Sequence, residues 1–153
     1  MRISRHQMLM SIAKVASQRS TCHRLNVGAV LSCDYGNVLS IGYNGAPRGK
    51  PHCGGSQCEY MSDKGCTVIH AEQNAIEHYD GDPTIVRACY VTHSPCTTCA
   101  ARLIMAGIRR VYYEVEYRDT NPLTRLTKMG VEVYRLLPSG YLVNRDTGEV
   151  SAT

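Results

Sequence analysis

The spacing of apolar residues along the chain predicts helices and strands in alternation. Met8, Ile12, Val15 and Ala16 recur at helical spacing behind Ser4, a residue type that often caps helix starts, and predict a helix over 4–19. Short apolar runs bounded by turn residues predict strands. The remaining expected elements are, in chain order, strands 27–33 and 37–44, helix 70–79, strand 86–92, helix 95–105, strand 109–117, helix 123–129 and strand 131–137.

Turn residues separate these elements. The segment DYG (34–36) favours a hairpin between the first two strands, and Gly107 and Gly130 are placed to end the third and fourth helices. Strands that alternate with helices favour right-handed crossovers and parallel neighbours. The sequence therefore predicts an α/β fold over a single domain, residues 1–153, with a three-layer α/β/α architecture and a mixed central sheet of about five strands.

Two stretches lack a long apolar period. Residues 45–66 are rich in Gly, Pro, Cys and polar residues. A loop of that length is uncommon inside a compact domain, so we expect it to be functional or held in place by a bound group. The tail, residues 138–153, has turn residues between short apolar runs and is consistent with a small hairpin.

Composition narrows the class of protein. The net charge is +4 without a block of like charges, so a nucleic-acid partner is not expected. The sequence has no apolar stretch of about 18 residues, so we expect no membrane partner and a cytoplasmic location. The eight cysteines are then expected to be metal ligands or reduced thiols rather than disulfides. Ten Tyr, with no Phe or Trp, supply all the aromatic rings.

Two short motifs carry the candidate chemistry. HAE (70–72) and PCTTC (95–99) each stand at the start of an expected helix. Alone, the first could be a surface helix fragment, and the second could be a redox pair or half of a structural zinc site. In this order and setting, however, the two motifs together indicate one catalytic metal site.

His70, Cys96 and Cys99 form the donor set that zinc prefers, an imidazole with two thiolates. Three ligands leave a fourth tetrahedral position for water, which is typical of a catalytic rather than a structural zinc site. Glu72 is then the candidate catalytic residue, a carboxylate that carries protons between water, the substrate ring and the departing amine. The alternative for Glu72 is a solvated glutamate that stabilises the start of its helix.

The chain resembles the cytidine and deoxycytidylate deaminase superfamily, whose signature is H-x-E followed by P-C-x-x-C. It is similar in particular to bacterial and phage forms of deoxycytidylate (dCMP) deaminase. The segments that carry the resemblance are VGA (27–29), GYNG (42–45), HAE (70–72), YVT (90–92) and SPCTTC (94–99).

The resemblance implies zinc-dependent hydrolysis of dCMP to dUMP and ammonia, a step that feeds thymidylate synthesis. It also implies a homohexamer activated by dCTP and inhibited by dTTP, with Mg²⁺ accompanying the triphosphate. The residues that it places at the allosteric nucleotide site are Gly42, Tyr43, Asn44 and Gly45. The alternative for this segment is a tight turn at the end of a strand, which Asn-Gly favours by itself.

A second group of cysteines precedes the catalytic motifs. Cys22, Cys53, Cys58 and Cys66 could hold a structural zinc, with His52 as the substitute ligand if one thiol does not bind. The resemblance supports this site, because bacterial and phage dCMP deaminases often carry one. The alternative is a set of reduced thiols on a mobile loop.

Substrate contacts are less determined by the sequence. Candidates are Arg24, Asn26 and Arg118 for polar contacts and Tyr117 for stacking on the pyrimidine, although each could equally be a surface side chain. Within the enzyme class, a tRNA adenosine deaminase or a free-cytidine deaminase would share both motifs. Outside it stands a noncatalytic zinc module that binds nucleic acid or protein. Glu72 separates the two classes, because that carboxylate has no role in a binding module.

Overall fold

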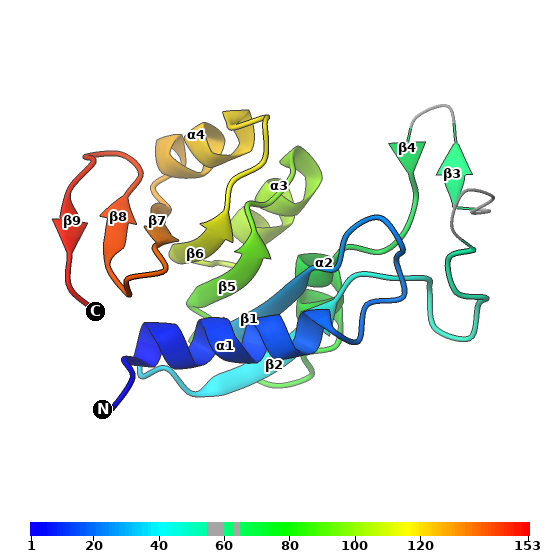
Figure 1. The fold of residues 1–153 in the computed structure, drawn as a ribbon, viewed down its shortest axis with the longest axis horizontal. Helices are drawn as coiled ribbons and strands as arrows, with labels where there is room; N and C mark the ends of the chain where they lie inside the picture. The colour runs from blue at the N-terminus through cyan, green and yellow to red at the C-terminus, as the bar shows by residue number, and fades with distance from the viewer. Residues whose placement is uncertain (55–59, 63–64) are drawn as a thin grey trace.

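A computed structural model of the chain describes residues 1–54, 60–62 and 65–153 (Figure 1). The helices are α1 Arg5–Ser17, α2 Ala71–Glu77, the 3-10 turn η2 Pro83–Ile85, α3 Thr97–Met105 and α4 Asn121–Lys128. The strands are β1 Gly28–Ser32, β2 Val38–Tyr43, β3 Met61–Ser62, β4 Gly65–Cys66, β5 Ala88–His93, β6 Arg110–Val115, β7 Glu132–Leu136, β8 Leu142–Asn144 and β9 Val150–Ser151.

Within the described residues, the main sheet contains seven strands in the order β2-β1-β5-β6-β7-β8-β9. Strands β5, β6 and β7 are parallel, whereas β1 pairs antiparallel with both β2 and β5. The mixed sheet is confirmed, and the expected count of about five strands is too low. The two extra strands, β8 and β9, come from the tail, where they add an antiparallel edge. They contain three and two residues, too few for a clear alternating pattern.

Helices cover both faces of this sheet, which confirms the three-layer α/β/α architecture. Helix α1 crosses one face, and α2, α3 and α4 lie on the other (Figure 1). Each face has its own apolar core. On the α1 side Leu9, Met10 and Ala13 pack against the sheet, and on the opposite side Leu103 and Leu123 belong to the larger cluster. Burial on both faces explains why all five residues of β1 are buried.

The predicted helix boundaries agree with local capping. Ser4 is the N-cap of α1, and its Oγ accepts a hydrogen bond from the Gln7 backbone while the Gln7 side chain accepts one from the Ser4 N–H. Gly107 follows α3 with a φ of 80°, a left-handed conformation that glycine adopts without strain.

Three tyrosines form a ladder across the parallel strands on the α1 side. Tyr90, Tyr112 and Tyr134 occupy matching positions in β5, β6 and β7. Their rings stack with centroid separations of 4.4 and 5.3 Å. His6 of α1 lies over the ladder, with its Nδ1 2.7 Å from the Tyr90 hydroxyl. The ladder therefore joins α1 to three strands through aromatic contacts.

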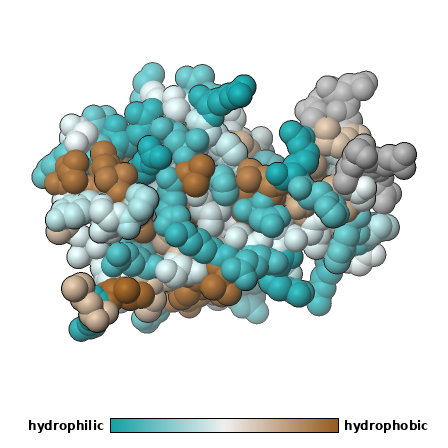
Figure 2. Space-filling view, viewed as in Figure 1, coloured by the Kyte–Doolittle hydropathy of each residue, from teal (hydrophilic) through white to brown (hydrophobic). Residues whose placement is uncertain are grey.

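The surface of the α1 face is mainly hydrophilic. Figure 2 shows apolar residues there in separate groups, surrounded by polar ones. No helix within the described ranges is long and apolar enough to cross a bilayer.

The long cysteine-rich segment is not devoid of regular structure. Met61 and Ser62 pair with Gly65 and Cys66 as a short antiparallel ribbon, separate from the main sheet. Cys58, one of the proposed structural zinc ligands, lies outside the described residues.

Candidate metal centre and substrate cavity

Two helix starts bring the predicted metal ligands together. His70 is the N-cap of α2 and Cys96 is the N-cap of α3, with Cys99 in the first turn of α3. The Nδ1 atom of His70 lies 3.4 Å from the Sγ atom of each cysteine. All three ligand atoms lie within 4.8 Å of one another. Cys96 and Cys99, which follow His70 by 26 and 29 residues in the sequence, thus lie next to it in the fold.

The geometry and the donor chemistry both fit a zinc ion. Ligands bound to tetrahedral zinc at about 2.0–2.3 Å are separated from one another by roughly 3.5 Å, close to the separations seen here. The positive ends of α2 and α3 favour anionic ligands at this place. A hydrogen bond from the Cys99 side chain lowers the pKa of Cys96 well below its usual range, so the pair readily provides a thiolate.

Glu72 lies in the first turn of α2, two residues after His70. Its side chain is buried, with an exposed fraction of 4%, and lines the same cavity as His70 and Cys96. Burial raises the pKa of Glu72 to about 7. A carboxyl group in such a position can exist in either protonation state near neutral pH, as proton transfer requires.

The cavity beside the metal centre has a volume of about 420 Å³. That volume is within the range of small-molecule sites, and its lining is mainly apolar with a few polar groups. The residues that line it are Cys22, Arg24, Leu25, Val27, Asn44, Cys66, Val68, His70, Ala71, Glu72, His93, Cys96 and Tyr117.

Strand β2 sets the position of the helix that carries Glu72. Gly42 faces α2 so closely that a Cβ atom there would lie 2.2 Å from the carbonyl oxygen of Ala71. The Ser40 hydroxyl donates to the Ala75 carbonyl, and the Asn74 side chain donates to the Tyr43 carbonyl. The segment GYNG therefore has a structural role, because it lets α2 pack directly against the sheet.

Asn44 and Gly45 fix the chain on either side of the cavity. The Asn44 Oδ1 accepts hydrogen bonds from the Val27 N–H and the Ser20 hydroxyl, and its Nδ2 donates to the Leu25 carbonyl. The backbone of Gly45 exchanges two hydrogen bonds with Ile69, the residue before His70. These bonds hold the cavity wall and the metal-ligand segment to the end of β2.

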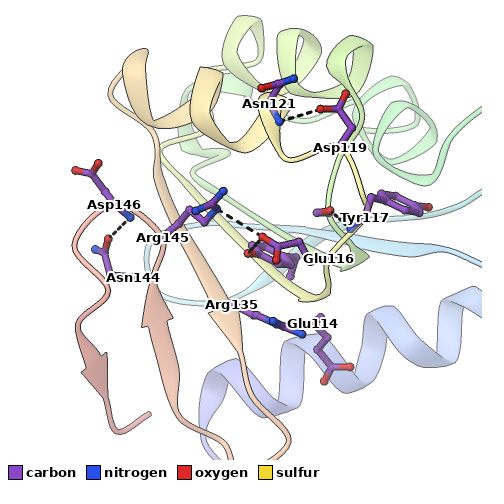
Figure 3. A network of polar contacts seen from close by, with 11 residues as sticks. Glu114, Glu116, Tyr117, Asp119, Asn121, Arg135, Asn144, Arg145 and Asp146 are labelled. Atoms are coloured by element: carbon purple, nitrogen blue, oxygen red, sulfur yellow. Dashed lines mark hydrogen bonds and ion pairs between the residues drawn. The ribbon is translucent and has the colours of Figure 1, made fainter.

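Tyr117 forms a side wall of the cavity just beyond β6. Its backbone N–H donates to the Ser94 Oγ at 2.9 Å, and its ring stacks on His93 with the centroids 5.6 Å apart. The preceding residue, Glu116, lies 3.6 Å from the guanidinium of Arg145 in the tail (Figure 3). Contacts from two neighbouring segments thus restrain the chain that carries this ring.

Of the other substrate candidates, Arg24 lines the cavity, whereas Asn26 and Arg118 are not among its lining residues in the described part of the chain. The Nη1 atom of Arg24 lies 3.5 Å from the Met61 sulfur. Asn26 is exposed and borders a neighbouring surface cleft with His52. Arg118 is exposed beyond the end of β6.

Cys22, Cys53 and Cys66 of the second cysteine group lie within the described residues. Cys22 and Cys66 line the cavity beside the metal centre, and Cys53 is buried. Among residues 1–54, 60–62 and 65–153, the only metal-type cluster of His, Cys, Asp and Glu is the one at His70. The structural zinc site therefore stays a prediction.

Sequence reasoning does not identify His93 or Asn44 as cavity residues in the enzyme site. A signal for His93 exists, since it ends a parallel strand directly before the cysteine motif, and ligands bind at the carboxyl ends of parallel strands. The sequence points to Asn44 only as part of a regulatory site, because it gives no indication that β2 ends beside Glu72.

Comparison with known proteins agrees with this geometry. The chain is 42% identical over 123 residues to ComE operon protein 2 of Bacillus subtilis, which covers 79% of this chain and 64% of that protein. It is 37% identical over 123 residues to the deoxycytidylate deaminase of Mycobacterium phage D29, covering 72% of this chain and 94% of the phage protein.

The fold also matches a solved structure. The dCMP deaminase of cyanophage S-TIM5, in complex with dCMP and dUMP, superposes with a TM-score of 0.73 at 34% identity, covering 88% of this chain and 98% of the phage chain. The family model for the cytidine and deoxycytidylate deaminase zinc-binding region matches residues 3–115, which include both the histidine and the cysteine motif. These matches, together with the ligand cluster and the buried glutamate, show that the chain belongs to the cytidine and deoxycytidylate deaminase family.

Proposed function

We propose that this chain is a zinc-dependent enzyme that hydrolyses dCMP to dUMP and ammonia. The observation that carries the proposal is the placement of buried Glu72 beside the ligand cluster, at the wall of a cavity large enough for a nucleotide base. A noncatalytic zinc module would have no use for a buried carboxyl group next to an open metal site. Burying such a group is costly unless it has a partner or a function.

The residues of the cavity can perform the steps of this reaction. Zinc held by His70, Cys96 and Cys99 would supply a Lewis acid that acidifies water. Hydrolysis replaces the C4 amino group of cytosine with oxygen from water. Glu72 would take a proton from that water and pass it to ring nitrogen N3, then take the proton of the new C4 hydroxyl and deliver it to the departing amine, so that ammonia leaves as the C4 carbonyl forms. Tyr117 would stack against the pyrimidine, and the apolar lining would exclude bulk water.

The choice of dCMP is supported by the relatives. The phage D29 and cyanophage proteins, which this chain covers almost completely, are named as dCMP deaminases. The chain spans only 64% of the Bacillus relative and 43% of the fission yeast deoxycytidylate deaminase. Its substrate is therefore inferred chiefly from the phage proteins of similar length.

A panel of substrates tests this proposal. The zinc-loaded chain is incubated separately with dCMP, dCTP, cytidine and an RNA hairpin, and ammonia release is measured. We expect turnover of dCMP alone or far above the others. Turnover of cytidine but not of dCMP would contradict the nucleotide assignment, and turnover of the RNA alone would indicate a tRNA deaminase.

We also propose that residues 1–153 form one domain that assembles as a homohexamer, with dCTP as activator, dTTP as inhibitor and Mg²⁺ bound to the triphosphate. Support comes from the family resemblance and from a cleft of about 560 Å³ along GYNG that is lined by Arg48, Lys50 and His52. The contact of Gly42 with α2 would connect this cleft to Glu72. Adding each triphosphate with Mg²⁺ to the dCMP assay, and light scattering of the purified protein, would test these points.

A structural zinc at Cys22, Cys53, Cys58 and Cys66, with His52 as a substitute, is proposed on the same resemblance. Cys53→Ser should then reduce the zinc content from about two ions per chain to about one. About one zinc ion per chain in both proteins would rule out this second site.

A further inference from the structure

His93 occupies a position in the cavity that the proposed reaction has not used. It is the last residue of β5 and lines the cavity together with Glu72. One face of its ring packs on Tyr117, with an interplanar angle of 28°. The imidazole therefore contacts the Tyr117 ring at the wall of the cavity.

A chain of hydrogen bonds determines which ring nitrogen of His93 carries the proton. The Gly28 N–H donates to the Thr92 Oγ1 at 3.2 Å, and the same oxygen lies 2.9 Å from the His93 Nδ1. Thr92 is buried, and within the described residues its hydroxyl proton has no acceptor other than Nδ1. A buried hydroxyl group that donates no hydrogen bond destabilises the folded state. Donation from Thr92 to Nδ1 satisfies the hydroxyl proton and leaves the proton of the neutral ring on Nε2.

The other nitrogen remains available. In the described part of the chain, no group hydrogen-bonds to the Nε2 atom of His93. Burial lowers the pKa of His93, which favours the neutral ring. His93 thus offers an uncharged N–H donor among the residues that line a mainly apolar cavity, where each polar group has a strong effect on ligand orientation.

We propose that His93 is a substrate-positioning residue whose Nε2–H donates a hydrogen bond to an oxygen of the bound pyrimidine nucleotide, and that Thr92 fixes the tautomer that makes this possible. This inference rests on the proposed function. The acceptor is an oxygen either of the phosphate or of the nucleoside, two sources with the same hydrogen-bonding chemistry. His93 itself takes no part in bond making or breaking.

The tautomer can be measured without activity. Nitrogen-15 NMR of the zinc-loaded chain, assigned with His93→Gln, should show His93 neutral with its proton on Nε2. Thr92→Val should populate the other tautomer, whereas the matched control Thr92→Ser, which keeps the hydroxyl, should not. Addition of dUMP should shift the Nε2–H signal. A proton on Nδ1 in the unchanged protein, or an Nε2–H signal that dUMP leaves in place, would overturn the proposal.

Kinetics supply the second test. His93→Phe keeps a ring against Tyr117 but removes the donor, and should raise KM for dCMP about 5- to 10-fold with kcat changed less than about 2-fold. His93→Gln restores an N–H and should recover much of the lost affinity. Equal KM values for His93→Phe and the unchanged enzyme would contradict the inference, as would a loss confined to kcat.

Deoxycytidine distinguishes the two acceptors. If the KM effect of His93→Phe disappears with deoxycytidine, the acceptor is the phosphate, and if it persists, the acceptor belongs to the nucleoside. Failure of the unchanged enzyme to turn over either compound would count against the proposed function. The response of the Nε2–H signal to dUMP would then decide the role of His93 separately.

Discussion

At the scale of single residues, the site depends on one buried carboxyl group whose surroundings differ from those of an ordinary helix glutamate. Glu72 is almost fully buried, although its place in the first turn of α2 would suit a solvated residue equally well. Burial next to the ligand cluster supports the proton-transfer role that we propose for it. Removal of its charge should therefore affect the chemistry much more than the assembly of the site.

Replacement Glu72→Gln tests this role. We expect kcat for dCMP to fall by about 10²- to 10⁴-fold, because an amide cannot carry protons between water and the pyrimidine. Zinc content, measured by plasma mass spectrometry, should not change, since the three ligands remain. Glu77→Gln, an exposed glutamate at the other end of α2, provides the matched control and should retain turnover. Comparable loss in both variants would contradict a specific role for Glu72.

At the scale of elements, the close packing of α2 on β2 positions the candidate site residues. The missing Cβ of Gly42 allows the backbone of α2 to approach the strand, and hydrogen bonds from Ser40 and Asn74 fasten the two elements together. Since His70 and Glu72 both lie at the start of α2, a small shift of this helix would move both at once.

Replacement Gly42→Ala should displace α2. The added methyl group would meet backbone atoms, which cannot move aside as a flexible side chain can. We expect a loss of about 1–3 kcal/mol in the free energy of unfolding, measured in urea, together with reduced kcat. At Gly81 an added methyl would meet only the far end of the Tyr79 side chain, so Gly81→Ala should be nearly neutral. A stable and fully active Gly42→Ala protein would refute the packing argument.

At the scale of the whole molecule, the metal would join two helices on the same side of the sheet. Its ligands come from α2 and α3, which otherwise make few contacts with one another, so a bound ion is a cross-link between them. A ligand that binds the folded state alone stabilises it in proportion to its affinity.

Removal of zinc should therefore lower thermal stability. Treatment with a chelator, checked by metal analysis, should reduce Tm by about 5 °C or more and abolish turnover. Re-addition of zinc should restore both, whereas magnesium should restore neither. An unchanged Tm in protein confirmed to be metal-free would show that the ligand cluster does not stabilise the fold.

The sequence predicts those features of the fold and of the site that depend on neighbouring residues, and it does not predict those that depend on contacts between distant segments. The motifs at His70 and Cys96 can be recognised because the spacing of metal ligands on helix starts is a local property. The approach of Asn44 to the cavity depends on how two distant loops meet, which local patterns do not encode. The tail hairpin of β8 and β9 is indicated by its turn residues, but its addition to the main sheet depends on the pairing of β8 with β7, which the sequence of the tail does not show.

The tyrosine ladder has a consequence for spectroscopy. Because the chain contains no Trp and no Phe, its near-ultraviolet circular dichroism arises mainly from tyrosine, and closely stacked, immobile rings should dominate that signal. Tyr112→Leu, which removes the central ring, should weaken the band strongly, whereas Tyr35→Leu, at a side chain 82% exposed, should leave it nearly intact. The ladder would then serve as an intrinsic optical probe of the sheet, reporting its packing without an attached dye.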